Sequence, residues 1–347
     1  MAQRKNAAVL RTHPHRYGAG RREILMMLGG AAAWPLAAQG QDAGPRKRIA
    51  VLLSARQGDH EYQGYIAGFR EALEMHGWSE RRNIQIDYRW GALDAQSQER
   101  FAKELVVLRP HVIVTQNTPT TAAVLQQTRS IPIVFAAVSD PVGSGFVVGL
   151  PRPGANVTGF IDLEGSLAGK WLELLKEIVP TMARTAFLFN PATAPFAEYY
   201  LKPFRAAALS LAVEAISAPV KDESELEARI ATQAREPNSG LIVMPEAFLN
   251  AHAAQVTTLA ARYRLPAVYP HRFFTQEGGL MSYGNDLRDS FRRAASYADR
   301  ILRGEKPDEL PVQLPINFEL AINNNAAKGL GITIPELFLL RADEVIE

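Results

Sequence analysis

The chain has 347 residues, a formal net charge of +2, an apolar fraction of 47% and no cysteine. The lack of cysteine excludes a disulfide scaffold, thiol catalysis and a cysteine-ligated metal, and we expect no cysteine-linked lipid anchor. The length is sufficient for two domains.

Residues 1–40 have the three parts of an export signal. Arg21 and Arg22 precede an uncharged apolar stretch at 26–38, and small residues follow as a cleavage point. The paired arginines indicate the twin-arginine route, which carries folded proteins across the bacterial inner membrane. The apolar stretch is too short for a membrane span of about 20 residues and contains two glycines and a proline. We therefore expect export to the periplasm.

The positive charge of the chain is concentrated in this leader. Residues 1–40 carry six basic side chains against one acidic side chain. Subtracting this excess of five from the total of +2 leaves about −3 for residues 41–347. A slightly acidic body has no basic footprint for nucleic acid, so we expect no nucleic-acid partner.

From residue 49 onward, buried-strand patterns alternate with amphipathic-helix patterns. The apolar run at 49–53 predicts a parallel strand covered on both faces, and the alternation at 84–90 predicts a half-exposed strand near a sheet edge. Repeated strand–helix units require parallel pairing and right-handed crossovers, which predicts an α/β protein with two Rossmann-like, doubly wound lobes. Strands are expected at 49–53, 84–90, 112–115, 131–138, 185–189, 213–217, 241–244 and 267–269, and helices at 62–73, 101–108, 121–128, 167–179, 196–211, 223–234, 251–263 and 290–302.

Three segments rich in glycine, proline or both predict crossings between the lobes. An ordinary surface loop is the alternative for the first of them. Three crossings would allow the lobes to close around a ligand by hinge motion. The segments are 139–145 with 151–156, 278–284 and 310–315. The expected division is 1–40 export signal, 46–155 plus 285–312 lobe 1, and 156–284 plus 313–347 lobe 2.

Sequence patterns for catalysis are largely missing. There is no Gly-x-Ser-x-Gly elbow, no phosphate-binding loop and no His-Glu-x-x-His. Gly143, Gly145 and Gly149 do not form a dinucleotide fingerprint, because the third glycine comes one residue late. We interpret Asp59-His60-Glu61 as solvated loop charges and not as metal ligands. We therefore expect no enzyme activity, no cofactor and no metal site.

Polar side chains follow the ends of several predicted strands in both lobes. The carboxyl edge of an open parallel sheet forms the ligand crevice, so these residues favour one shared cleft. Thr120 or Thr121 would cap the following helix and leave backbone N–H groups beside Asn117 for an anion such as a carboxylate. Turn and cap chemistry is the alternative for each residue alone. The strand-end residues are Ser54, Asn117, Thr118, Ser139, Asp140, Asn190, Glu246 and His271.

Several motifs resemble one family, the tryptophan-binding-protein-like substrate-binding proteins of ABC transporters. The similarity lies in the leader, in Ile-Pro-Ile-Val-Phe at 131–135 with Ser-Asp-Pro-Val at 139–142, and in Pro-Gly-Ala-Asn-Val-Thr-Gly at 153–159. Gly-Gly-Leu-Met-Ser-Tyr-Gly at 278–284 and Leu-Pro-Val-Gln-Leu-Pro at 310–315 continue it. The resemblance implies a type I periplasmic-binding fold with a ligand between two lobes. The ligand-binding candidates that it implies here are Ser54, Asn117, Thr118, Ser139, Asp140, Asn190, Glu246 and Tyr283.

The resemblance implies the periplasmic solute-binding component of an ABC-type uptake transporter. Its partners would be a small polar, amino-acid-like molecule and an ABC permease at the inner membrane, and we expect a monomer. A sensory binding protein that reports to a receptor would use the same cleft. An exported hydrolase on an α/β scaffold is the alternative from another class of protein.

Overall fold

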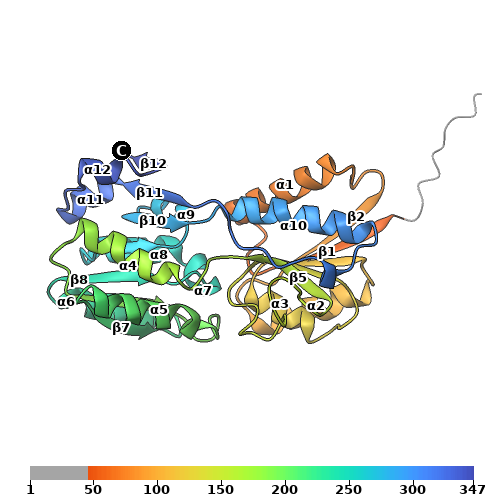
Figure 1. Cartoon of the computed structure of the whole chain (residues 1–347), viewed down its shortest axis with the longest axis horizontal. Helices are drawn as coiled ribbons and strands as arrows, with labels where there is room; N and C mark the ends of the chain where they lie inside the picture. The colour runs from red at the N-terminus through yellow and green to blue at the C-terminus, as the bar shows by residue number, and fades with distance from the viewer. Residues whose placement is uncertain (1–45) are drawn as a thin grey trace, which may run out of the picture. The chain divides into compact units, whose positions relative to one another are not determined.

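The computed structural model describes residues 46–347, which form two lobes, each built around its own β-sheet (Figure 1). The first lobe contains β1 (Lys47–Leu53), α1 (His60–Met75), β2 (Ile84–Trp90), α2 (Ala95–Val107), β3 (Val112–Thr115), α3 (Thr118–Leu125), β4 (Ile133–Val138), β5 (Val157–Ile161), α10 (Leu287–Leu302) and the 3-10 helix η1 (Pro307–Glu309). Its five strands are parallel in the order β2-β1-β3-β4-β5. The strand at 84–90 therefore lies at a sheet edge, which confirms that prediction.

The second lobe has a seven-stranded sheet in the order β12-β11-β10-β9-β8-β6-β7. All of its strand pairs are parallel except β10–β11. Together the two sheets confirm the predicted α/β fold with two doubly wound lobes. The elements are α4 (Leu167–Ile178), β6 (Arg184–Phe189), α5 (Ala197–Ser210), β7 (Glu214–Pro219), α6 (Glu223–Arg235), β8 (Ser239–Val243), α7 (Ala247–Ala251), α8 (Ala253–Arg262), β9 (Ala267–Tyr269), α9 (Arg272–Gln276), β10 (Met281–Gly284), β11 (Glu319–Asn323), α11 (Asn324–Leu330), α12 (Glu336–Leu339) and β12 (Glu344–Ile346).

Strand β1 shows why its sequence is apolar throughout. Successive side chains of a strand point to opposite faces of the sheet. Ile49 and Val51 pack on the face covered by α1 and α10, whereas Ala50 and Leu52 pack on the face covered by α2 and α3. Helix α10 turns its apolar stripe inward as expected, and its Phe291 ring stacks on Tyr65 of α1 with centroids 5.6 Å apart.

Strand β5 changes one lobe boundary. We expected lobe 2 to begin at 156, but β5 pairs with β4 and completes the first sheet. Gly159 permits this close pairing, because it has a φ of +152° and a Cβ at this position would lie 2.1 Å from the Phe135 carbonyl oxygen. The first crossing therefore follows Ile161 and comes later than the Gly/Pro-rich segment indicated.

The second predicted joint, at 278–284, is largely a strand. Its last four residues form β10, which pairs with β9 and β11 inside the second sheet. The chain then crosses to α10 through residues 285–286, and it crosses back between η1 and β11. Phe160 bridges to Gln313, so the third crossing runs beside β5. The elements β11, α11, α12 and β12 were not predicted.

The expected loop charges at 59–61 begin a helix. The Asp59 carboxylate caps α1 by accepting hydrogen bonds from the N–H groups of Glu61 and Tyr62. Among residues 46–347 no cluster of three side chains has the arrangement of a metal site. No helix in the same range is long and apolar enough to cross a membrane. The predicted export signal, residues 1–40, lies outside the described residues.

Candidate functional site

A cavity lies at the carboxyl ends of strands from both lobes and contains about 430 Å³ of space, part of it open to solvent. Both sheets bring polar loops to it, as the strand-end argument predicted. Its walls combine aromatic and aliphatic side chains with neutral polar groups and two carboxylates. The lining residues are Tyr65, Gln116, Asn117, Thr118, Pro119, Ala137, Ser139, Asp162, Thr193, Phe196, Pro245, Glu246, Ala247, Asn250, Leu287 and Phe291.

Asn117 and Thr118 stand at the start of α3, facing this cavity. We expected Thr120 or Thr121 to be the N-cap, and this is wrong, because Asn117 takes that position. The Asn117 side chain accepts a hydrogen bond from the Thr120 N–H at 3.2 Å, and the Thr120 hydroxyl accepts one from the Asn117 N–H at 3.0 Å. This reciprocal capping box fixes Asn117 at the edge of the cavity.

Ser54 supports Asn117 from behind and does not line the cavity. Its hydroxyl donates to the Asn117 side-chain oxygen at 3.2 Å and accepts from the Gln98 amide at 2.9 Å. Its backbone N–H donates to the Gln116 side-chain oxygen at 2.8 Å. Ser54 therefore orients two of the residues that do line the cavity.

Ser139 and Asp140 are neighbours in sequence but lie in different surroundings. Ser139 is buried in the cavity wall, with its hydroxyl 3.1 Å from that of Tyr200. Asp140 has a φ of +44°, and its carboxylate accepts a hydrogen bond from the Gly143 N–H at 2.8 Å. The structure gives Asp140 a turn-forming contact and does not bring it to the cavity.

In the second lobe Glu246 reaches the cavity while capping a helix. Its carboxylate accepts from the N–H groups of Phe248, at 2.7 Å, and Leu249, at 2.9 Å, and from the Thr193 hydroxyl. Burial is the main cause that raises the pKa of Glu246 to about 7, against these hydrogen bonds, which lower it. The carboxyl group therefore keeps its proton to a higher pH than an exposed glutamate does.

The two remaining predicted residues act elsewhere. Asn190 is buried, and its side chain accepts from the Ala192 N–H at 2.8 Å and donates to the Lys221 carbonyl at 2.9 Å, which holds the loop before α5. Tyr283 stacks on Phe318 with centroids 5.8 Å apart. Neither lines the cavity, so four of the eight candidates meet there: Asn117, Thr118, Ser139 and Glu246.

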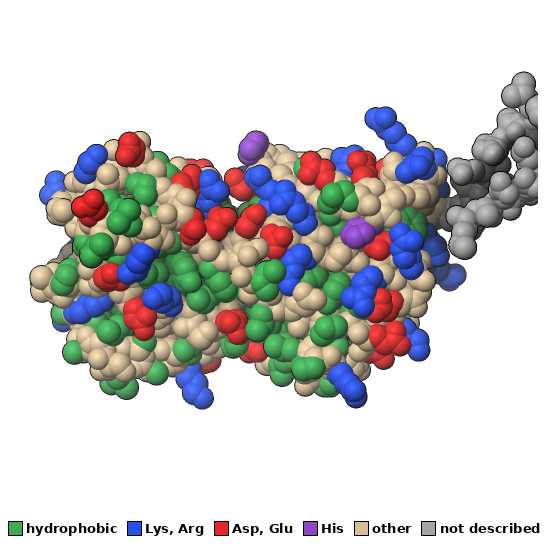
Figure 2. All heavy atoms as spheres, turned by 45° about the horizontal axis from the view of Figure 1, so that its top comes forward, with side chains coloured by type: hydrophobic (Ala, Val, Ile, Leu, Met, Phe, Trp, Pro, Cys, Tyr) green, Lys and Arg blue, Asp and Glu red, His purple; other side chains and the backbone are tan. Residues whose placement is uncertain are grey.

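A second, more polar hollow adjoins the cavity and shares Tyr65 and Leu287 with it. Figure 2 shows acidic side chains gathered over this junction of the lobes. Both hollows contain buried polar groups that were not among the candidates. The second hollow is lined by Glu61, Tyr65, His271, Arg272, Phe273, Gln276, Asn285, Asp286, Leu287, Arg288 and Glu319.

Sequence reasoning missed Asp162, Asn250 and Asn285, and it named His271 only as a strand-end residue. Asp162 directly follows β5, a strand that was not expected. Asn285 directly follows β10, which was interpreted as part of a joint. The signal that could have found both is the one used elsewhere, a polar residue at the carboxyl end of a strand.

The cavity is electrostatically suited to a cation or a zwitterion. Asp162 and Glu246 are its two acidic lining residues, and no lysine or arginine lines it within residues 46–347. Burial raises the pKa of the Tyr65 hydroxyl well above its ordinary value, so this group remains a neutral donor beside the cavity. An anionic group of a ligand would meet hydroxyls, amides and backbone N–H groups.

Fold and cavity together define a two-lobed α/β binding protein. The pattern of the family described as "ABC transporter substrate binding protein" matches residues 49–346. The chain therefore belongs to this family of ABC transporter substrate-binding proteins, which are solute-binding proteins and not enzymes. This confirms the predicted resemblance.

Individual relatives agree with this assignment. A tyrosine-binding protein of Clostridioides difficile is 26% identical over 263 residues, which cover 76% of this chain and 75% of that protein. A conserved domain protein from Vibrio cholerae has a TM-score of 0.80 at 27% identity, covering 86% of this chain and 99% of its own. An ABC domain from Streptococcus pneumoniae in complex with L-Trp has a TM-score of 0.81 at 24% identity, covering 87% and 100%.

Proposed function

We propose that this protein is the periplasmic solute-binding component of an ABC-type uptake transporter and captures an amino-acid-like ligand in the cavity. The single observation that carries the proposal is the composition of the cavity wall: neutral polar groups and aromatic rings from both lobes, together with the carboxylates of Asp162 and Glu246. Such a wall suits a zwitterion with an apolar or aromatic body. The amino-acid-binding relatives support the same ligand class.

In this proposal the carboxylate of the ligand binds at the start of α3. Asn117 holds the helix end, and Thr118 and Ser139 add hydroxyl groups within the same wall. The helix N-terminus favours negative charge through its backbone dipole. Tyr65, Phe196 and Phe291 would cover the apolar body of the ligand.

Ligand binding would favour closure of the lobes about the three crossings, and the permease would recognise the closed form. After the correction at β5, we propose that one moving lobe consists of residues 46–161 and 285–312. The other consists of residues 162–284 and 313–347. The proposed export signal at 1–40 would deliver the protein to the periplasm through the twin-arginine route, where it would act as a monomer.

A thermal-shift screen tests this function. Each standard amino acid would be added to the purified protein at a concentration well above micromolar, because a ligand that binds only the folded state raises the melting temperature. We expect at least one amino acid to raise it by several degrees and to be recovered chemically unchanged after incubation. If no amino acid shifts the transition, the proposed ligand class is wrong, and conversion of the added compound would indicate an enzyme.

A further inference from the structure

Unpaired buried polar atoms concentrate in the two hollows. Across residues 46–347, eight buried side-chain polar atoms have no hydrogen-bond partner, and five of them belong to residues that line the hollows. Leaving a buried polar group without a partner costs about 1–3 kcal/mol, so such groups are uncommon without a purpose. The four residues are Asp162, Asn250, His271 and Asn285.

The missing partners are mainly hydrogen-bond donors. The unpaired atoms of Asp162, Asn250 and Asn285 are side-chain oxygens, which accept hydrogen bonds. The other Asp162 oxygen lies 3.6 Å from His271 Nε2, which is too far for a hydrogen bond. Asp162 is 5% exposed and Asn285 7%, so bulk water does not solvate them freely.

Glu246 provides the contrast within the same cavity. Its carboxylate already accepts three hydrogen bonds from the protein, and its charge is weakened by a raised pKa. Asp162 has no such set of donors and no arginine or lysine beside it in the cavity wall. Of the two carboxylates, Asp162 is therefore the one prepared to receive a charged donor.

The chain placement of these residues links them to the crossings. Asp162 directly follows β5 on the first crossing, and Asn285 directly follows β10 on the second. His271 lies on the short segment between β9 and α9. Two of these three residues therefore lie on crossings, and His271 lies beside one of them, with its Nε2 3.6 Å from the Asp162 carboxylate. The adjoining hollow adds the carboxylates of Glu61, Asp286 and Glu319 against the guanidinium groups of Arg272 and Arg288.

We propose that Asp162, Asn285 and His271 form a subsite for a protonated amine of the ligand. The amine supplies the N–H donors that the oxygens of Asp162 and Asn285 lack, and His271 completes the pocket beside Asp162. Because the amine touches two crossing segments, its binding acts directly on the connection about which the lobes would close. This inference rests on the proposed function, since the subsite is part of the same ligand site.

The test compares matched ligands on the wild type and on Asp162→Asn. The probes are the standard amino acids, each with its deaminated acid and its decarboxylated amine, such as L-tyrosine, 3-(4-hydroxyphenyl)propanoate and tyramine. Calorimetry should show that deamination abolishes binding of whichever amino acid binds the wild type. Asp162→Asn should weaken that amino acid by about 10- to 100-fold, the range for a hydrogen bond to a charged group.

Two controls separate binding from folding. Asp162→Asn removes an unpaired buried charge, so the melting temperature of the free variant should be equal to or higher than that of the wild type. Asp222→Asn makes the same change at the exposed cap of α6 and should leave affinity unchanged. A lower melting temperature of free Asp162→Asn with full affinity would identify a structural carboxylate and overturn the subsite.

The outcomes distinguish this subsite from the function itself. If an amino acid binds the wild type and Asp162→Asn equally well, or if its deaminated acid binds as tightly, the subsite is wrong and the binding function stands. If neither amino acids nor amines bind the wild type, the proposed function fails and the subsite falls with it.

Discussion

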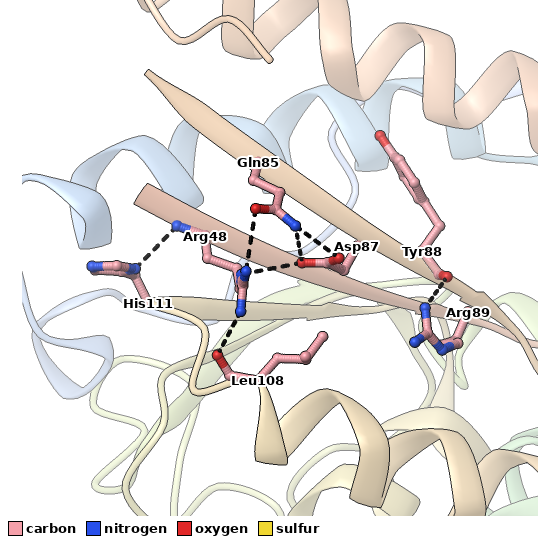
Figure 3. A network of polar contacts seen from close by, with 7 residues as sticks. All are labelled: Arg48, Gln85, Asp87, Tyr88, Arg89, Leu108 and His111. Atoms are coloured by element: carbon pink, nitrogen blue, oxygen red, sulfur yellow. Dashed lines mark hydrogen bonds and ion pairs between the residues drawn. The ribbon is translucent and has the colours of Figure 1, made fainter. Parts of the chain in front are cut away.

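The two ends of the first sheet differ in how completely their polar side chains are hydrogen-bonded within the protein. At the amino end, Arg48 is fully partnered: its guanidinium donates to the Leu108 carbonyl at 3.1 Å and to the Gln85 side chain at 3.2 Å and lies 3.3 Å from the Asp87 carboxylate (Figure 3). The Arg48 N–H donates to His111 Nδ1 at 3.0 Å. At the carboxyl end, Asp162, which directly follows β5, has a buried side-chain oxygen without a partner. The first end serves stability, and the second retains binding capacity.

The comparison predicts that substitutions at the two ends change different measurements. Changes at the amino end should lower the free energy of unfolding and leave ligand affinity intact. Changes at the carboxyl ends of the strands, in either sheet, should alter ligand affinity or the pH dependence of stability. A polar network that is satisfied internally has little left to offer a ligand.

The largest expected effect is on stability through Glu246. Its pKa is about 7 in the folded protein against 4.5 ordinarily, so the folded state holds a proton that the unfolded state releases between these values. The stabilising contribution is therefore complete below pH 4.5 and is lost as the pH rises through 7. The difference amounts to about 3 kcal/mol. Urea unfolding from pH 4 to 8 should show that the free energy of unfolding of the wild type falls with rising pH relative to that of Glu246→Gln.

Glu246→Gln keeps an oxygen that can accept from the helix N–H groups but cannot titrate. The wild type and the variant share every other titrating group, so subtracting their curves isolates Glu246. Parallel curves for the two proteins would show that the Glu246 carboxyl is not perturbed by burial.

The next effect is on affinity through Asn117. Asn117→Ala removes the cap of α3 and the side chain that Ser54 orients. We expect about tenfold weaker binding of the amino acid found in the screen, together with a loss of about 1 kcal/mol in the free energy of unfolding. Calorimetry and urea unfolding measure the two effects separately.

Asn117→Asp serves as the matched variant because it preserves the cap but adds a negative charge. It should retain stability while repelling a ligand carboxylate, and so bind more weakly than the wild type. Unchanged affinity in both variants would remove the start of α3 from the ligand site.

A smaller effect is expected at the amino end of the sheet. Arg48→Met should lower the free energy of unfolding by about 1 kcal/mol, because the side chain is one-third exposed but has three partners. Ligand affinity should not change. Arg89→Met is the control, since Arg89 lies on the adjacent strand and pairs mainly with Glu104 at 2.9 Å; it should cost less. A weaker affinity in Arg48→Met would contradict the division between the two ends.

The sequence predicted the two-lobed architecture because buried parallel strands require continuous apolar runs, which Ile49 to Leu53 illustrate. It placed Asn117 and Glu246 at the cavity because both directly follow or cap elements at the carboxyl edge. It missed β5, since a strand that depends on Gly159 for its close approach resembles a loop in composition. Asp162 was missed with it.

Side-chain direction is the second reason why the predicted site residues differ from those that line the cavity. Asn190 carries the same polar groups as Asn117, but its side chain already forms hydrogen bonds within its own loop and with Lys221. Tyr283 belongs to β10, and its ring turns to Phe318. Whether a polar group is consumed by its own loop depends on backbone angles and on neighbours distant in sequence, which periodicity does not specify.

The smallest effect is expected at Asp140. Its carboxylate accepts from the Gly143 N–H, and its φ of +44° is one that Asn tolerates as well as Asp. Asp140→Asn should therefore keep both the turn and the affinity, with the free energy of unfolding changed by less than about 0.5 kcal/mol. The same chemical change at Asp162 should cost at least tenfold in affinity. Asp140 and Asp162 follow neighbouring strands of one sheet, and they would then differ only in whether the carboxylate already accepts a hydrogen bond within a turn. A loss of affinity in Asp140→Asn would instead show that Asp140 belongs to the ligand site.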